Sequence, residues 1–157
     1  MNKYANSRIV EYFHGMFGKM TMEIDADGKV LDAAALKAFT QGQCHSFALA
    51  VHQLTGWTLA AIAFDTSEFG REDIYSGERD AEPANILCLT PDGQLFDIHG
   101  TGARRNLQRA PAHRVQPTDE ARVRSLQTYL KPNLEAALPF ARTLLEKEGY
   151  TWEAESR

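Results

Sequence analysis

Apolar residues near the start of the chain recur every three or four positions. The series comprises Ile9, Val10, Phe13, Met16, Phe17 and Met20. Positions with this spacing lie on one face of an α-helix, so the pattern predicts an amphipathic helix over residues 6–20. Asn6 or Ser7 can cap its start, whereas Gly15 and Gly18 weaken its interior.

Two further helical patterns follow. The first is the short run AAALKAF, which Asp32 can cap and which ends at Phe39. The second is CHSFALAVHQLT, which comes after the polar stretch TQGQ and before Gly56, a helix-stopping residue. Its apolar stripe consists of Phe47, Ala48, Val51 and Leu54. This stripe places Cys44 in the first turn of a buried helix.

Strand patterns occupy the middle of the chain. Residues 58–64 (TLAAIAF) are apolar throughout, which is typical of a buried strand. Residues 85–90 and 94–99 flank the turn sequence Pro91-Asp92-Gly93. Two apolar runs joined by such a turn predict a β-hairpin.

The last third of the chain predicts irregular backbone followed by two helices. Prolines within and just after the basic segment 104–114 disfavour regular structure there. Thr118 can cap a helix that reaches Leu130. Pro132 and Asn133 then restart a helix that reaches Gly149. Pro139 either kinks that last helix or begins it. The order of the elements predicts an α+β fold.

Length and composition narrow the possible classes of protein. A chain of 157 residues is expected to form a single domain, residues 1–157. A net charge of −4, with both signs scattered, disfavours general binding of nucleic acid. The acidic segment 65–83 predicts an exposed loop. No run approaches the roughly 18 apolar residues that span a bilayer, so no membrane partner is expected.

Cysteine usage and the N-terminal sequence point to a compartment. Cys44 and Cys88 are too few for a disulfide scaffold and show no CxxC spacing, so neither a metal nor another cofactor is expected. The N-terminal residues carry charges where a signal peptide needs an unbroken apolar core. We therefore expect a cytoplasmic protein, with secretion by a route that needs no cleaved signal left open.

The candidate chemistry centres on Cys44. Unpaired N–H groups and the positive end of the dipole at a helix start lower the pKa of a thiol. The same N–H groups, with the side chain of Gln41 or Gln43, could hold an oxyanion. Asp97 and His99 are two residues apart on the predicted strand and would share one face, which suits an imidazole base and its orienting carboxylate.

Each candidate residue also has a plain structural interpretation. Cys44 equally suits the role of a small buried apolar residue, and Asp97 equally suits a cap of the turn that follows it. His45 points about 100° around the helix from Cys44, so an exposed position or a local cap suits it better than the role of base. His52 fits the edge of the core, and Cys88 fits a strand interior.

GQCHSFALAVHQLTGW followed by NILCLTPDGQLFDIHG resembles the papain-like cysteine-hydrolase superfamily, most closely its transglutaminase-like and NlpC/P60-like cores. The resemblance implies an α+β fold in which the Cys-bearing helix packs on a small antiparallel sheet, flanked by N- and C-terminal helices. It matches Cys44 to the nucleophile and Asp97 to the orienting polar residue. The family's His should open the first hairpin strand, where this chain has Asn85. An asparagine cannot take a proton at neutral pH.

Three explanations for Asn85 stay open. His99, or less readily His45, acts as the base; or the chain has lost activity and uses its cleft for binding; or Asn85 is a substitution that traps a substrate or tames a toxic enzyme. We expect a cysteine-dependent hydrolase or acyltransferase that acts on an amide, peptide or isopeptide bond of a protein or peptide. A domain of this kind suits a bacterial or phage-encoded modifier of another protein. The alternative is a non-catalytic inhibitor, immunity or adaptor module.

Overall fold

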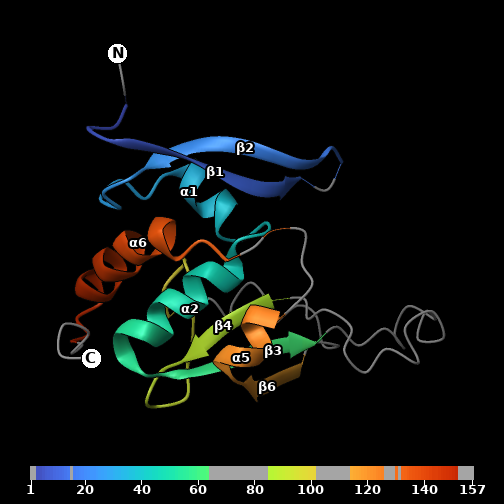
Figure 1. Cartoon of the computed structure of the whole chain (residues 1–157). Helices are drawn as coiled ribbons and strands as arrows, with labels where there is room; N and C mark the ends of the chain where they lie inside the picture. The colour runs from blue at the N-terminus through green and yellow to red at the C-terminus, as the bar shows by residue number, and fades with distance from the viewer. Residues whose placement is uncertain are drawn as a thin grey trace.

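The computed structural model describes residues 3–14, 16–63, 85–101, 114–125, 130 and 132–151. Within these residues the chain forms four α-helices and two antiparallel sheets, which confirms the predicted α+β class. Figure 1 shows the two-stranded sheet β1–β2 above α1, with α2 between this hairpin and a second sheet, and α6 beside α2. The second sheet has four strands in the order β5-β4-β3-β6.

The N-terminal segment is a β-hairpin, so the helix predicted over residues 6–20 is wrong. Strands β1 (Ser7–His14) and β2 (Gly18–Asp25) pair antiparallel, with Val10 opposite Met22. Val10 is buried whereas its neighbour Ile9 is exposed, as expected when successive side chains point to opposite faces. Gly18 has a positive φ of 79° where β2 begins, which suits a tight reversal.

Helix α2 (Cys44–Thr55) has the predicted bounds. It ends at Gly56, whose φ of 77° is left-handed and whose N–H donates to the His52 carbonyl. The preceding helix α1 (Ala33–Ala38) begins as predicted, with the Asp32 side chain accepting a hydrogen bond from the Ala35 N–H. Local capping signals therefore fix both helices.

The four-stranded sheet contains the predicted strand and hairpin. Its strands are β3 (Thr58–Ala63), β4 (Asn85–Leu89), β5 (Leu95–Phe96) and β6 (Arg114–Thr118). Two details differ from the prediction. The second hairpin strand stops at Phe96, well before His99, and residues 114–118 form a strand despite Pro117. A proline is tolerated there because β6 lies at the edge of the sheet.

Two C-terminal helices complete the described fold. Helix α5 (Glu120–Ser125) is capped by Asp119, whose side chain accepts from the Arg122 N–H, and not by Thr118. Helix α6 (Leu134–Lys147) begins at its Asn133 cap and continues through Pro139. The predicted restart of a helix at Pro132 and Asn133 is thus confirmed, and the alternative in which the helix begins at Pro139 is wrong.

A cluster of phenylalanines joins these elements. Phe47 of α2 lies within 6.3 Å of Phe39 and Phe96, measured between ring centroids, and Phe39 lies 5.5 Å from Phe140 of α6. All four rings are almost fully buried. Burial of such large apolar side chains is the main driving force for folding. Helix α2 is therefore the central element, in contact with α6 and β4.

Two charged segments of the sequence fall outside the described part of the chain. They are the acidic segment 65–83 and the basic segment 104–114, apart from the backbone of Arg114 in β6. Among the helices that are described, none is long and apolar enough to cross a bilayer.

Candidate functional site

Cys44 is the first residue of α2, and its sulfur faces backbone N–H groups. The N–H groups of Ile86 in β4, of His45 and of Cys44 itself all stabilise the thiolate form. Burial of the sulfur outweighs them and raises the pKa of the Cys44 thiol, and the nearby Asp97 carboxylate raises it further. The lowered pKa expected at a helix start is therefore not what this environment produces.

Asp97 lies in a turn directly after β5. Its carboxylate accepts a hydrogen bond from the His99 N–H at 2.8 Å, and its backbone carbonyl accepts one from the Gly100 N–H at 2.7 Å. The expectation that Asp97 and His99 share one face of a strand is thus wrong. The turn that Asp97 was alternatively expected to cap is present.

The Asp97 and His99 side chains still lie together in that turn. Asp97 Oδ1 is 3.5 Å from His99 Nδ1, and the His99 side chain is 36% exposed. Asp97 is 8% exposed, and its burial raises the pKa of the carboxyl, while the contacts with His99 act in the opposite direction. A buried carboxylate on one side of an imidazole orients the ring and stabilises its protonated form.

Three segments that are distant in sequence thus meet at the start of α2. Cys44 comes from the helix, Ile86 from the second residue of β4, and Asp97 from the turn after β5. Asn85 opens β4 and pairs with Ile62 of β3 through its backbone. The Asn85 side chain lies outside the described part, but the Ile86 contact puts the neighbouring backbone beside the Cys44 sulfur.

The two glutamines before the helix have different environments. Gln43 is buried, and its amide group donates to the Glu11 carbonyl at 3.0 Å and accepts from the Ser46 hydroxyl. Gln43 therefore ties α2 to β1. Gln41 is exposed, and its backbone carbonyl accepts from the Phe13 N–H at 2.7 Å. Of the two side chains proposed to hold an oxyanion, only that of Gln41 is exposed to solvent.

Each of the two histidines of α2 forms a hydrogen bond with a backbone carbonyl. His45 is buried, not exposed as expected, and its Nε2 donates to the Leu130 carbonyl at 3.1 Å. Burial lowers the pKa of the His45 imidazole, and the bond to Leu130 only partly offsets this effect. His52 donates from Nδ1 to the Trp57 carbonyl at 2.7 Å. Neither ring is therefore positioned as a partner of the thiol.

Cys88 has the structural role predicted for it. Its side chain is fully buried, and its thiol donates to the Ala48 carbonyl at 3.3 Å. Burial raises the pKa of the Cys88 thiol far above its usual range. The two cysteines are both free, and the structure separates them by their neighbours: only Cys44 has backbone N–H groups and a carboxylate beside it.

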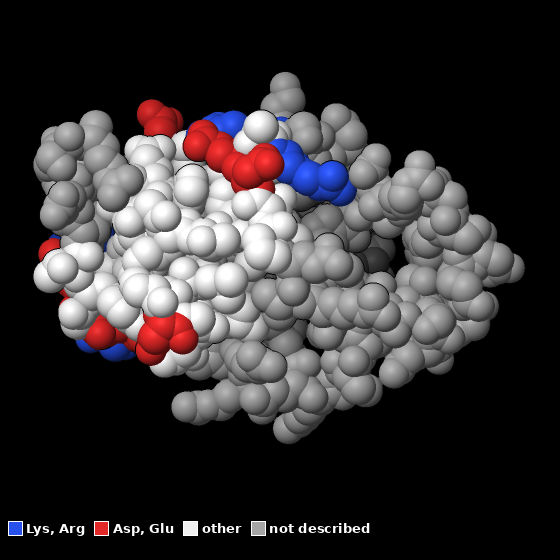
Figure 2. All heavy atoms as spheres, turned by 90° about the horizontal axis from the view of Figure 1, so that it is seen from below, with Lys and Arg blue, Asp and Glu red and all other residues white. Residues whose placement is uncertain are grey.

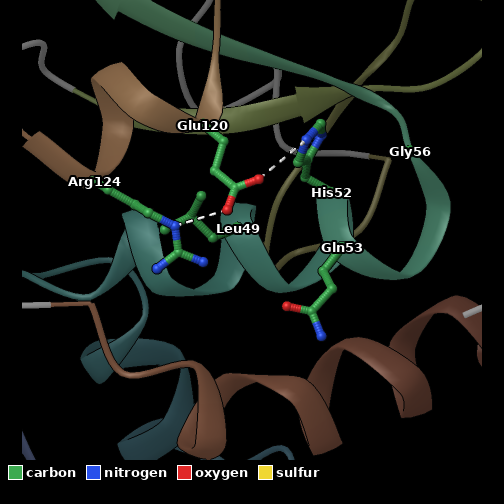
Figure 3. Close-up of a pocket in the computed structure, with 6 residues that line it drawn as sticks. All are labelled: Leu49, His52, Gln53, Gly56, Glu120 and Arg124. Atoms are coloured by element: carbon green, nitrogen blue, oxygen red, sulfur yellow. Dashed lines mark hydrogen bonds and ion pairs between the residues drawn. The ribbon is translucent and has the colours of Figure 1, made fainter. Parts of the chain in front are cut away.

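A polar pocket at the opposite end of α2 was not anticipated from the sequence. Figure 3 shows Glu120 of α5 between His52 and Arg124, with Gln53 and Gly56 at the margin of the hollow. Its volume is about 400 Å³. The Arg124 Nε donates to Glu120 at 2.7 Å, and His52 Nε2 is 4.0 Å from the same carboxylate. The spacing of Glu120 and Arg124, four positions apart on one helix, was the available sequence signal.

Neither region has the donor set of a metal centre. Within the described ranges, no group of three or more His, Cys, Asp and Glu side chains is arranged to hold a metal ion. Figure 2 shows the molecule from below: over the described part of this face the surface is mainly uncharged, and basic and acidic side chains lie next to one another at its margin.

No protein-family model, curated protein or solved structure matches the chain. Function must therefore be argued from the site alone. The start of α2 offers a thiol with backbone N–H donors and the Asp97 carboxylate nearby, and Asp97 in turn contacts His99. A thiol and N–H donors of this kind suit nucleophilic attack on a carbonyl. The pocket at the other end offers charged groups that already neutralise one another.

Proposed function

We propose that the chain is a papain-like, cysteine-dependent hydrolase or acyltransferase that acts on an amide, peptide or isopeptide bond. The observation that carries the proposal is the meeting of Cys44, the Ile86 N–H and the Asp97 carboxylate at the start of α2. The order of parts is similar to the one that the resemblance implies: a nucleophile on a helix, then a group from the first hairpin strand and one from the turn after the second.

The raised pKa of Cys44 favours the protonated thiol as the state that meets the substrate. Burial keeps the sulfur protonated, so a base must remove the proton as the sulfur attacks. His99 is the candidate, because its Nδ1 faces Asp97 and its Nε2 remains to accept the proton.

The reaction follows from these roles. The Cys44 proton passes to His99 as the sulfur bonds to the carbonyl carbon, and the carbonyl oxygen becomes an oxyanion. The N–H groups of Cys44 and His45 can donate to that oxygen. The imidazolium returns the proton to the leaving amine as the C–N bond breaks, which leaves a thioester. Water then gives hydrolysis, whereas an amine gives acyl transfer.

The alternative is a non-catalytic binding module on the same scaffold. The specific observation in its favour is the raised pKa of the partly buried Cys44 thiol, since a protonated thiol is a poor nucleophile. Asn85 at the expected position of the histidine supports the same alternative. A partner protein would then take the place of a substrate.

Iodoacetamide labelling of the folded protein, followed by mass spectrometry of the Cys44 peptide, separates the two functions. The decisive variant is Asp97→Asn. Without catalysis, loss of the carboxylate charge lowers the pKa of Cys44 and speeds its alkylation, because that charge raises the pKa in the wild type. If Asp97 works through His99, the same variant slows alkylation.

Two companion variants complete the test. We expect His99→Ala to slow alkylation of Cys44 at neutral pH by about tenfold or more, because the variant lacks the general base. His52→Ala, at the far end of α2, is the matched control and should keep the wild-type rate. Faster labelling in Asp97→Asn together with no change in His99→Ala would exclude the enzyme. A gain of thiol reactivity in Asn85→His would identify that position as the site of a lost base.

A further inference from the structure

The outer edge of the N-terminal hairpin carries a row of backbone groups that no described segment covers. In β1 the Glu11 carbonyl accepts from Gln43 and the Phe13 N–H donates to Gln41, so both residues direct their backbone groups away from β2. Along a strand these directions alternate. The intervening residues of β1, such as Tyr12, therefore form the hydrogen-bonded pairs with β2.

The register between β1 and β2 fixes which residues of β2 direct their backbone groups toward β1 and which direct them away from it. Tyr12 pairs with Met20 and Val10 pairs with Met22, so these two methionines direct their backbone groups toward β1. Lys19, Thr21 and Glu23 then direct theirs away from β1. No described residue forms a backbone hydrogen bond with the outer side of these three residues, whereas the Asp25 carbonyl at the end of β2 accepts from the Gly28 N–H at 3.2 Å. Figure 1 shows β2 on the side of the hairpin away from α2. An open strand edge of this kind is a template for pairing with another strand.

The sequence of β2 is nearly symmetrical about Thr21. It reads Lys-Met-Thr-Met-Glu over residues 19–23. If two copies of β2 pair antiparallel with Thr21 opposite Thr21, Lys19 of each copy lies opposite Glu23 of the other. Met20 lies opposite Met22 in the same arrangement. Opposite charges in such cross-strand pairs stabilise a sheet, and like charges destabilise it.

Other registers fit less well. The outward groups belong to odd-numbered residues, so the register can shift only in steps that keep these residues opposite one another. A shift in one direction puts Lys19 opposite Thr21 and gives neither charge a partner on the other copy, so Lys19 keeps only its ion pair with Glu11 of its own chain at 3.7 Å. A shift in the other direction puts Lys19 opposite Asp25, whose buried carboxylate already accepts from the N–H groups of Lys29 and Val30. Only the register centred on Thr21 pairs both charges.

Exposed apolar side chains lie at the two ends of this edge. Met16 and Phe17 at the hairpin turn are 79% and 68% exposed. In the symmetrical register Phe17 lies opposite Asp25 of the other copy. Val30, which is 37% exposed, lies beside Asp25, since its N–H donates to that carboxylate at 2.9 Å. Each turn would therefore meet the apolar end of the other copy's strand.

We propose that β2 pairs with β2 of a second copy of this chain, about a two-fold axis at Thr21, to form the four-stranded sheet β1-β2-β2-β1. The contact is isologous, so it closes as a dimer and does not extend into a filament. Its inner face continues the one that carries Tyr12 and Met20, and its outer face carries the Lys19 and Glu23 pairs. The proposal does not depend on the activity of Cys44.

Charge reversal tests the register directly. Lys19→Glu gives a chain with two glutamates at these positions, and Glu23→Lys gives a chain with two lysines. Each variant alone would place like charges opposite one another, so we expect the dissociation constant of its dimer to rise by about tenfold or more over the wild type. An equimolar mixture of the two variants restores both opposite-charge pairs and should form a heterodimer. Sedimentation equilibrium measures all three samples.

The outcomes are distinct. Concentration-dependent dimerisation of the wild type, weaker association of each single variant and recovery in the mixture support the proposal. A wild type that stays monomeric up to about 1 mM has a dimer dissociation constant above that concentration, which overturns the proposal. The open edge of β2 would then pair with a strand of a different protein. Equal dimerisation of wild type and single variants also overturns it, because the contact then lies elsewhere.

Thr21→Pro provides a second line. The Thr21 N–H points away from β1, so the proline removes a donor of the proposed interface and no hydrogen bond of the hairpin. We expect a monomer with an unchanged far-ultraviolet circular dichroism spectrum. A Thr21→Pro dimer as stable as the wild type contradicts the pairing of β2 edges.

Discussion

The two ends of α2 carry similar side chains in opposite environments. At its start, Gln43, His45 and Ser46 are buried, and each is hydrogen-bonded to a group from another segment or to its neighbour. At its end, Gln53 is exposed and His52 is partly exposed beside an open pocket. The polar side chains at the start of α2 are therefore buried, whereas those at its end are exposed to solvent.

The difference shows how burial changes the value of a polar group. In a low-dielectric interior a hydrogen bond is stronger and an unpaired group is costly, whereas water compensates for either at the surface. The pKa values of Cys44, His45 and Asp97 all shift mainly through burial. Polar residues at the start of α2 are thus expected to control stability and chemistry, and those at its end to have small effects.

The largest expected effect is the loss of Gln43. Gln43→Ala leaves the Glu11 carbonyl and the Ser46 hydroxyl without this partner in a buried place, and we expect a destabilisation of about 2–3 kcal/mol. Urea unfolding measures the free energy. Gln53→Ala, the same substitution at the exposed end, is the control and should change it by less than about 0.5 kcal/mol. Equal effects at both ends would remove the contrast.

A second effect concerns the pH dependence of stability. The pKa of His45 is lower in the folded protein than its ordinary value of 6.5, so below pH 6.5 the unfolded chain binds a proton that the folded chain does not. The stability from neutral His45 is complete above pH 6.5 and is lost as the pH falls toward the folded pKa. For one proton the slope is at most about 1.4 kcal/mol per pH unit.

The variant His45→Gln isolates this contribution, because glutamine can keep a donor toward Leu130 but does not titrate. We expect urea unfolding to show a shallower fall in stability between about pH 7 and pH 5 in the variant than in the wild type. Asp97, whose pKa is raised, acts with the opposite sign in both proteins and cancels in the comparison. An unchanged slope would contradict a role for His45 in acid sensitivity.

The smallest effect is expected at the open pocket. Glu120→Gln removes the ion pair with Arg124 and the longer-range contact with His52, but both carboxylate and guanidinium are almost half exposed. Exposed pairs of this type contribute about 0.3–0.5 kcal/mol and weaken with salt. A double-mutant cycle with Arg124→Gln measures the coupling. A coupling free energy above about 1 kcal/mol would contradict the solvent exposure of this end of α2.

The elements predicted correctly are those with strong local signals. Helix α2 was predicted because Gly56 supplies a left-handed cap, and the hairpin β4–β5 because Pro91-Asp92-Gly93 favours a turn. The position of Cys44 at a helix start followed from the polar stretch before it and from the apolar stripe that begins at Phe47. These features depend on a few neighbouring residues and could be identified without the tertiary structure.

Features that depend on distant packing were missed. In the N-terminal segment the apolar spacing suited a helix, although the segment forms a hairpin. Gly18, which begins β2 with a positive φ, was the residue that indicated a turn. The pKa of Cys44 could not be predicted from its helix position, because the cover supplied by β4 and the charge of Asp97 comes from residues 40 or more positions away. Asp97 and His99 stay together because Asp97 accepts from the backbone of His99, not because a strand continues.

The hydrogen bond from the Asn133 N–H to the Ser46 hydroxyl spans 87 positions of the sequence. On the ribosome, β1, β2 and α2 emerge long before residue 133. The hydrogen bond to the Ser46 hydroxyl therefore cannot form until the chain has been synthesised past Asn133. Closing so long a loop is slow compared with forming a hairpin or a helix. The segment around Cys44 should therefore gain its final shape late in synthesis, after the N-terminal hairpin has formed.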